Sequence, residues 1–101
     1  MDRHNLDWRH REDYIRTRSA RRSEETDIDP TWASEAAADP LAQVIDPDPA
    51  STSGRSVRVI GYSPTADTVI TVIVVDEEGI TYGVNAWRAN PKDERDYWES
   101  T

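Results

Sequence analysis

Seven polar side chains between residues 58 and 97 of this 101-residue chain have the chemistry needed to handle a phosphodiester. Guanidinium groups bind phosphate oxygens through paired N–H donors, and they stabilise the charge that develops when a ribose 2′-hydroxyl attacks phosphorus. Phenol groups can assist proton movement. Spacing alone leaves open the alternative that these side chains are solvated or paired with nearby acids. They are Arg58, Tyr62, Thr81, Asn85, Arg88, Arg95 and Tyr97.

Other chemistries lack the residues they need. The chain has no cysteine, and therefore no disulfide, thiolate metal site or thiol nucleophile. His4 and His10 are six residues apart and cannot share a helix face as metal ligands. Asp46 and Asp48 resemble the start of a calcium loop, but the next alternate position is Ala50 and no glutamate closes the pattern. The four glycines are scattered and form no phosphate-binding loop, so the sequence predicts neither a metal nor a cofactor.

A sheet must position the polar side chains. The run from Thr68 to Val75 is apolar on both alternating faces, which is typical of a strand covered on both sides. A short strand is expected over Leu41–Ile45, at an edge. The two runs that flank the central one are each apolar on one face only. Their expected apolar residues are Val57 and Val59 before it, and Ile80, Tyr82 and Val84 after it.

Helix signals occur at three places. A stripe of Trp8, Tyr14 and Ile15 at helical spacing predicts the first helix. Two others begin with an N-capping side chain followed by proline, which suits the first helical position. The second must end before Pro40, since the residue before proline disfavours helical dihedrals. The expected helices are Asp7–Ser23, Pro30 to before Pro40, and Pro91 onwards, the last anchored by Tyr97 and Trp98.

Turn residues complete an α+β domain over residues 1–101, with two N-terminal helices, an antiparallel four-stranded meander and a C-terminal helix. Ser63–Ala66 is expected to close the first hairpin, and Asp76–Gly79 the second as a bulged turn. Residues 46–55 are turn formers with almost nothing to bury and predict a mobile surface loop. Residues 1–6 are expected to be flexible.

The net charge of −8 is unevenly distributed. Up to Arg22 there are seven arginines and four acids, a net of +3, so the rest of the chain carries −11. Basic blocks attract nucleic acid, but the favoured interpretation is that these arginines form the solvated face of the first helix, against acids elsewhere on the fold. The first ten residues lack the apolar core of a signal peptide, and no run is long enough to cross a bilayer, so a cytoplasmic protein is expected.

The order and spacing of several short segments resemble the BrnT family of type II toxins, which are ribonucleases with a RelE-like fold. The similarity runs from about Ala38 to Glu99. The chain departs from the family pattern in having Trp87 where an arginine is usual, and in lacking the Lys-His-Gly after the first helix. The matching segments are Ala38–Leu41, Val57–Ser63, Val72–Val75, Asn85–Asn90 and Glu94–Glu99.

The resemblance implies a toxin that cleaves RNA without a metal and is neutralised by a cognate antitoxin, and it allows a homo-oligomer. The alternative is a non-catalytic protein-interaction domain that keeps the BrnT-like fold, which the two departures favour. The residues at family-like catalytic positions are Arg58, Arg88, Glu94, Arg95 and Tyr97, with Tyr62, Asn85 and Trp87 as candidates for binding substrate.

Overall fold

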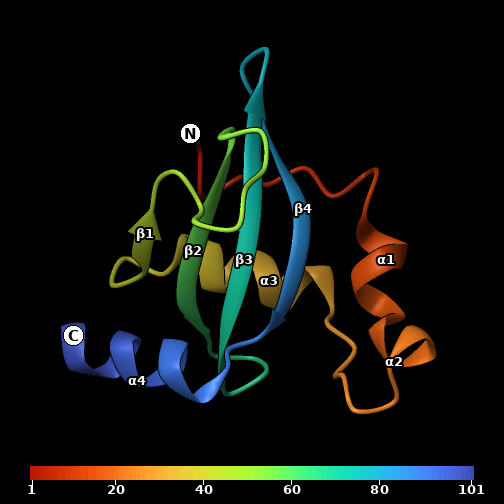
Figure 1. The fold of residues 1–101 in the computed structure, drawn as a ribbon, viewed down its shortest axis with the longest axis vertical. Coiled ribbons are helices and arrows are strands. Elements are labelled where there is room, and N and C mark those ends of the chain that lie inside the picture. Colours follow the sequence, from red (N-terminus) through yellow and green to blue (C-terminus); the bar gives the residue numbers. More distant parts are fainter.

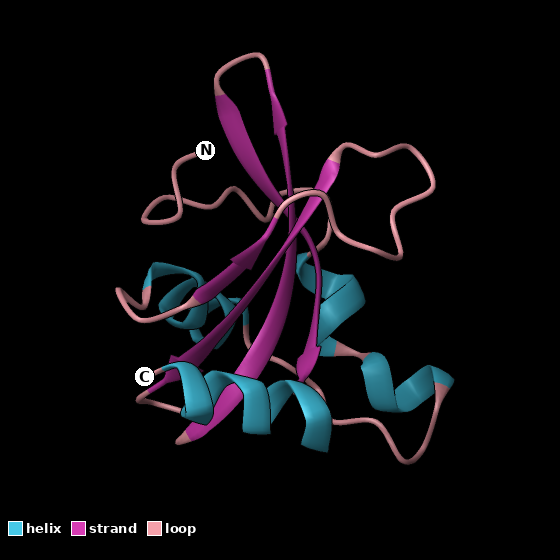
Figure 2. Ribbon diagram, turned by 60° about the vertical axis from the view of Figure 1, so that its left-hand side comes forward, coloured by secondary structure: helices cyan, strands magenta, loops and turns pink.

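The computed structural model describes residues 1–101 and shows one antiparallel sheet flanked by four helices (Figure 1). The strands lie in the order β1-β2-β3-β4, which is the expected meander. Helices α3 and α4 cover opposite faces of the sheet (Figure 2). The α+β fold class is therefore confirmed. The elements are α1 (Glu12–Arg16), α2 (Arg18–Arg21), α3 (Pro30–Ala38), β1 (Gln43–Ile45), β2 (Ser56–Ser63), β3 (Thr68–Glu77), β4 (Ile80–Arg88) and α4 (Pro91–Ser100).

Two apolar clusters cover the two faces of the central strand, β3. On the face towards α3, Val72 and Val74 are fully buried with alanines of that helix. On the face towards α4, Val69 packs with Ile60 of β2 and Tyr97 of the helix. Strand β3 is thus apolar on both faces because both faces are covered, as the sequence predicted. We call these two sides the α3 face and the α4 face.

Strand β4 differs from its expected pattern because a bulge shifts its register. Ile73 of β3 pairs with Asn85, but Val74 pairs with Gly83, so Val84 is an extra residue. The buried residues before the bulge are therefore Thr81 and Gly83. The prediction that Ile80, Tyr82 and Val84 form the apolar face is wrong, and Ile80 is 37% exposed.

The expected helix over Asp7–Ser23 is also wrong in its extent. Asp7 pairs with β4 instead, donating its N–H to the Thr81 carbonyl and accepting from the N–H of Gly83, both at 2.9 Å. This pairing directs Trp8 into the core against Gly83, where an added Cβ would lie 2.4 Å from the indole. Helical structure begins only at Glu12, and Thr17, with φ of −123°, separates α1 from α2.

The two proline-led helices begin at the predicted residues. The Asp29 side chain accepts a hydrogen bond of 2.8 Å from the N–H of Thr31 and caps α3, which ends before Pro40. The Asn90 side chain caps α4 in the same way through the N–H of Asp93. Of the two aromatic residues expected to anchor α4, Tyr97 is buried, whereas Trp98 is 53% exposed and lies with its ring 5.9 Å from that of Tyr62.

The connecting segments make several contacts with the rest of the fold. The second hairpin closes through Glu78 and Gly79, with φ of 51° and 82°, as a two-residue turn with two left-handed positions requires. No bulge occurs at that turn. In the 46–55 loop, Asp48 is buried and ion-paired. At the N-terminus, Arg3 donates to the carbonyls of Ala37 and Asp39. None of the helices combines the length and apolar character needed to cross a membrane.

Candidate functional site

Arg58 points from β2 onto the α4 face, where two buried carboxylates bind it. Its Nη2 lies 2.9 Å from Asp48 Oδ1, and its Nη1 lies 3.9 Å from Asp93 Oδ2. Asp93 also accepts a hydrogen bond of 3.3 Å from the hydroxyl of Thr71. The side chain of Arg58 is 19% exposed. The charge of Arg58 is therefore neutralised by carboxylates inside the fold, and Arg58 is poorly placed to bind a phosphate.

Arg88 and Arg95 do not join Arg58 at a common site. Arg88 follows Trp87 in β4 and pairs with Ile70, whose side chain lies in the core beneath α3, so Arg88 projects on the opposite face from Arg58. Arg95 lies two residues from each of the sheet-facing residues of α4, and at about 100° per residue it projects into solvent. The structure places the three predicted arginines on three separate surfaces.

The remaining predicted catalytic residues are engaged elsewhere or exposed. The hydroxyl of Tyr97 donates to Asp39 Oδ2 at 2.5 Å, and burial together with this hydrogen bond raises the pKa of Tyr97 to about 12. The hydroxyl of Tyr62 donates to Asp67, which raises the pKa of Tyr62. Glu94 is half-buried in α4 and makes no side-chain hydrogen bond or ion pair. Both phenols therefore have structural partners.

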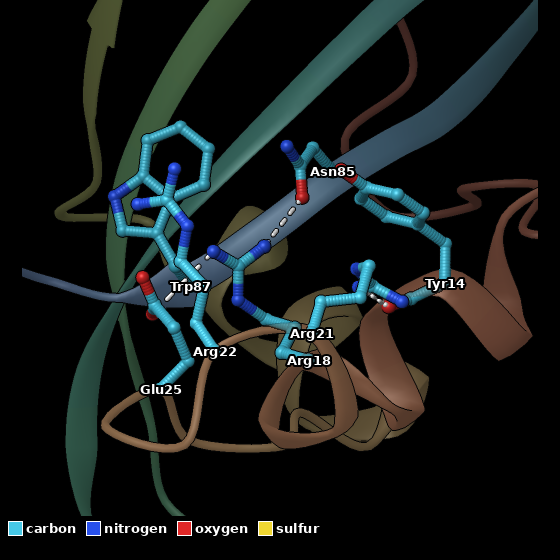
Figure 3. A pocket seen from close by; sticks show the side chains of 7 residues that line it. All are labelled: Tyr14, Arg18, Arg21, Arg22, Glu25, Asn85 and Trp87. Atoms are coloured by element: carbon cyan, nitrogen blue, oxygen red, sulfur yellow. Dashed lines mark hydrogen bonds and ion pairs between the residues drawn. The ribbon is translucent and has the colours of Figure 1, made fainter.

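Two of the predicted substrate-binding residues, Asn85 and Trp87, do meet in one pocket (Figure 3). The pocket has a volume of about 450 Å³ and lies between α2 and β4, on the α4 face. Its lining carries three guanidinium groups and one carboxylate, a net charge of +2 on a chain of net −8. We call it the basic pocket. It is lined by Tyr14, Arg18, Arg21, Arg22, Glu25, Asn85 and Trp87.

Arg18 forms the floor of the basic pocket. Its Nη1 donates to Asn85 Oδ1 at 2.9 Å, and its Nη2 lies 3.4 Å from Glu25 Oε2 (Figure 3). The Arg18 guanidinium also lies 5.8 Å from the ring centroid of Trp87, within range of a cation–π interaction. The Nε of Arg18 is buried without a hydrogen-bond partner. Arg18 therefore connects α2 to Glu25 and to Asn85 of β4, and its Nε–H remains free to donate a hydrogen bond.

Arg21 and Arg22 form the rim of the pocket. The Arg21 guanidinium stacks 4.0 Å from the ring centroid of Tyr14 and donates to the carbonyl of the same residue. Arg22 is exposed and makes no side-chain hydrogen bond or ion pair. In Figure 3 its side chain extends across the view in front of Trp87. Arg22 is thus a free cation at the entrance of a pocket with two aromatic walls.

The residues of the basic pocket come from the short helix α2 and from alternate positions of strand β4. Arg18 and Arg21 are spaced i and i+3 in the single turn of α2, which gathers them on one side, and Arg22 follows as the extended residue that ends the helix. On β4 the side chains of Asn85 and Trp87, two residues apart, share the α4 face. The helical spacing of the arginines could have been recognised in the sequence. Their position beside Trp87 depends on a long-range contact that no local pattern reports.

No three His, Cys, Asp or Glu side chains lie close enough together to hold a metal ion. Comparisons with models of protein families, with curated proteins and with solved structures find no match for this chain. The resemblance to BrnT therefore stays a prediction. The basic pocket combines a guanidinium floor and rim, two aromatic walls and one carboxylate.

Proposed function

We propose that the chain is a BrnT-like toxin that cleaves RNA without a metal, with the basic pocket as its active site. The observation that carries the proposal is the concentration of three arginines, two aromatic rings and one carboxylate in one pocket of an acidic protein. RNA supplies both complementary groups, phosphates for the guanidiniums and bases for the rings. The proposal includes a cytoplasmic location, a cognate antitoxin as partner, and room for a homo-oligomer.

The pocket contains the groups that RNA transesterification needs. Glu25 would accept the proton of a ribose 2′-hydroxyl as its oxygen attacks phosphorus. Arg18 and Arg22 would stabilise the charge on the phosphorane, and no metal is required for that role. The bond to the 5′-oxygen then breaks, and that oxygen takes a proton from the Tyr14 hydroxyl or from water. The products are a 2′,3′-cyclic phosphate and a free 5′-hydroxyl.

Incubation of the purified protein with single-stranded RNA in EDTA tests this proposal. Cleavage should persist in EDTA, should spare DNA, and should fall at least about 100-fold in Glu25→Gln, since general base catalysis contributes that much. Arg22→Ala should also lose most activity. Arg88→Ala and Arg95→Ala are matched controls, because they remove exposed arginines outside the pocket. An inert wild type, or equal losses in the controls, would overturn the proposal.

A second candidate is a non-catalytic interaction domain with the same fold. The engagement of Arg58 by Asp48 and Asp93, and of Tyr97 by Asp39, favours it, because residues at family-like catalytic positions serve the fold instead. Under this alternative, expression of the chain without a partner would not slow growth of the host. Growth arrest that Glu25→Gln abolishes would exclude it.

A further inference from the structure

The wall formed by Trp87 is the best-supported part of the basic pocket. Trp87 is half-buried, and its cross-strand partner on β3 is Thr71, which is fully buried. The guanidiniums of Arg18 and Arg58 lie 5.8 and 5.9 Å from the ring centroid. The indole is therefore within cation–π range of one arginine that lines the pocket and of one that does not. An aromatic side chain held in this way presents a fixed surface.

The arginine on the interior side cannot move freely. Arg58 is held between Asp48, from the 46–55 loop, and Asp93, from α4. Both carboxylates are 6% exposed, and Asp93 is also bonded to Thr71, directly across the sheet from Trp87. Three segments of the chain thus meet at Arg58, beside the Trp87 indole. Because Arg58 is held by two carboxylates, it gives the indole a fixed neighbour.

We infer that Trp87 is a stacking site for one unpaired nucleobase, with Arg58 as the positioning residue that holds the indole from behind. Stacking on an aromatic side chain is open only to a base that has left its own helix, so the ligand is single-stranded rather than duplex RNA. Phosphates on either side of that base would lie near Arg18 and Arg22, which line the same pocket. The inference rests on the proposed binding of RNA by the pocket but not on cleavage.

The donor and acceptor groups of the pocket agree with this ligand. The Oδ1 of Asn85 accepts from Arg18 and from the N–H of Ala86, at 2.9 Å each. The amide nitrogen of Asn85 makes no hydrogen bond, and it can donate to a carbonyl or ring nitrogen of a base. A carboxylate-rich peptide would use the arginines but would leave the indole without a stacking partner. The nucleotide uses both.

Fluorescence anisotropy with a labelled 2′-O-methyl RNA hexamer tests the inference, because this probe has no 2′-hydroxyl and cannot be cleaved by the proposed reaction. Trp87→Leu should weaken binding about 10-fold, whereas Trp87→Phe should keep most of it. Trp98→Leu is the matched control, since that exposed tryptophan lies on α4. Arg58→Lys should weaken binding less than Trp87→Leu. It should also increase acrylamide quenching of the tryptophan fluorescence in a Trp32→Phe, Trp98→Phe background, where the other remaining tryptophan, Trp8, is buried.

Two comparisons on the wild-type protein keep the inference testable if a variant does not fold. The hexamer should bind at least about 10-fold more tightly than the same strand with abasic positions, and more tightly than its duplex. Equal binding of the intact and abasic strands would overturn the inference, as would tighter binding of a glutamate-rich peptide. Binding that depends on Trp87 without cleavage of natural RNA would contradict the proposed ribonuclease alone. Binding that depends on Arg22 but not on Trp87 would contradict the stacking site alone.

Discussion

Replacing Arg58 by alanine should destabilise the fold far more than replacing any exposed arginine. The substitution leaves Asp48 and Asp93, each 6% exposed, without their shared cation. Removing one partner of a buried ion pair typically costs about 3–5 kcal/mol of unfolding free energy. For a domain of about 100 residues, a loss of about 4 kcal/mol lowers the melting temperature by roughly 20 °C. Such a loss is a large fraction of the roughly 5–15 kcal/mol available to a typical domain.

Urea unfolding followed by circular dichroism measures this change directly. Arg95→Ala is the control, because its exposed side chain makes no ion pair and its loss should change stability by less than about 0.5 kcal/mol. The triple variant Arg58→Met, Asp48→Asn, Asp93→Asn should recover much of the loss, since it removes the buried charges together. A loss below about 1 kcal/mol in Arg58→Ala would refute the view that the Asp48–Arg58–Asp93 cluster holds this face of the sheet.

Three further predictions concern packing and pH. Burial and the hydrogen bond to Asp39 raise the pKa of Tyr97 to about 12, so the stability this tyrosine adds is complete below pH ~10 and is lost as the pH rises towards 12. Urea midpoints should therefore fall in that window for the wild type and fall less in Tyr97→Phe, where Tyr62 and Lys92, whose pKa values are also raised, still titrate. The substitution itself should cost about 1.5–2 kcal/mol of unfolding free energy at neutral pH. Burial raises the pKa of Asp39, but hydrogen bonds from Tyr97 and from backbone N–H groups more than offset it, so this pKa is lowered. The wild type should lose stability as the pH falls below ~4, and Asp39→Asn should lose less over the same range. Acid unfolding curves of the same slope for both proteins would contradict this prediction. Gly61→Ala would place a Cβ 2.0 Å from the Ala36 carbonyl oxygen and should cost at least about 3 kcal/mol, whereas Gly54→Ala, with open space and φ of 74°, should cost about 1 kcal/mol; equal melting temperatures would contradict this.

The elements with strong local signals are the ones that the sequence predicts well. Asp29-Pro30 and Asn90-Pro91 each combine a capping side chain with a proline at the first helical position, and both helices begin there. The apolar run in β3, Thr68–Val75, consists only of β-branched residues, which favour a strand. Where the prediction is wrong, a long-range contact decides. The pairing of Asp7 with β4 replaces a helical turn by an extended segment, and no local pattern announces it.

The candidate site shows the same division. Strand alternation alone separates Trp87 from Arg88, and the helical period separates Arg95 from Tyr97, so the dispersal of the predicted arginines follows from rules that apply to any sequence. The burial of Asp48 is different, because it sits among turn formers and only the structure shows its pairing with Arg58. The contact between α2 and β4, which forms the basic pocket, is also a tertiary contact that the sequence does not predict.

Nuclear magnetic resonance titration of the 15N-labelled protein with the uncleavable 2′-O-methyl hexamer tests the location of the site most directly. The largest shifts should fall on the indole N–H of Trp87, the side-chain amide of Asn85 and the backbone N–H groups of residues 18–25. They should disappear in Arg22→Ala and persist in Arg88→Ala. Shifts centred on Arg88 or Arg95, with Trp87 and Asn85 unchanged, would contradict the assignment of the basic pocket as the RNA site.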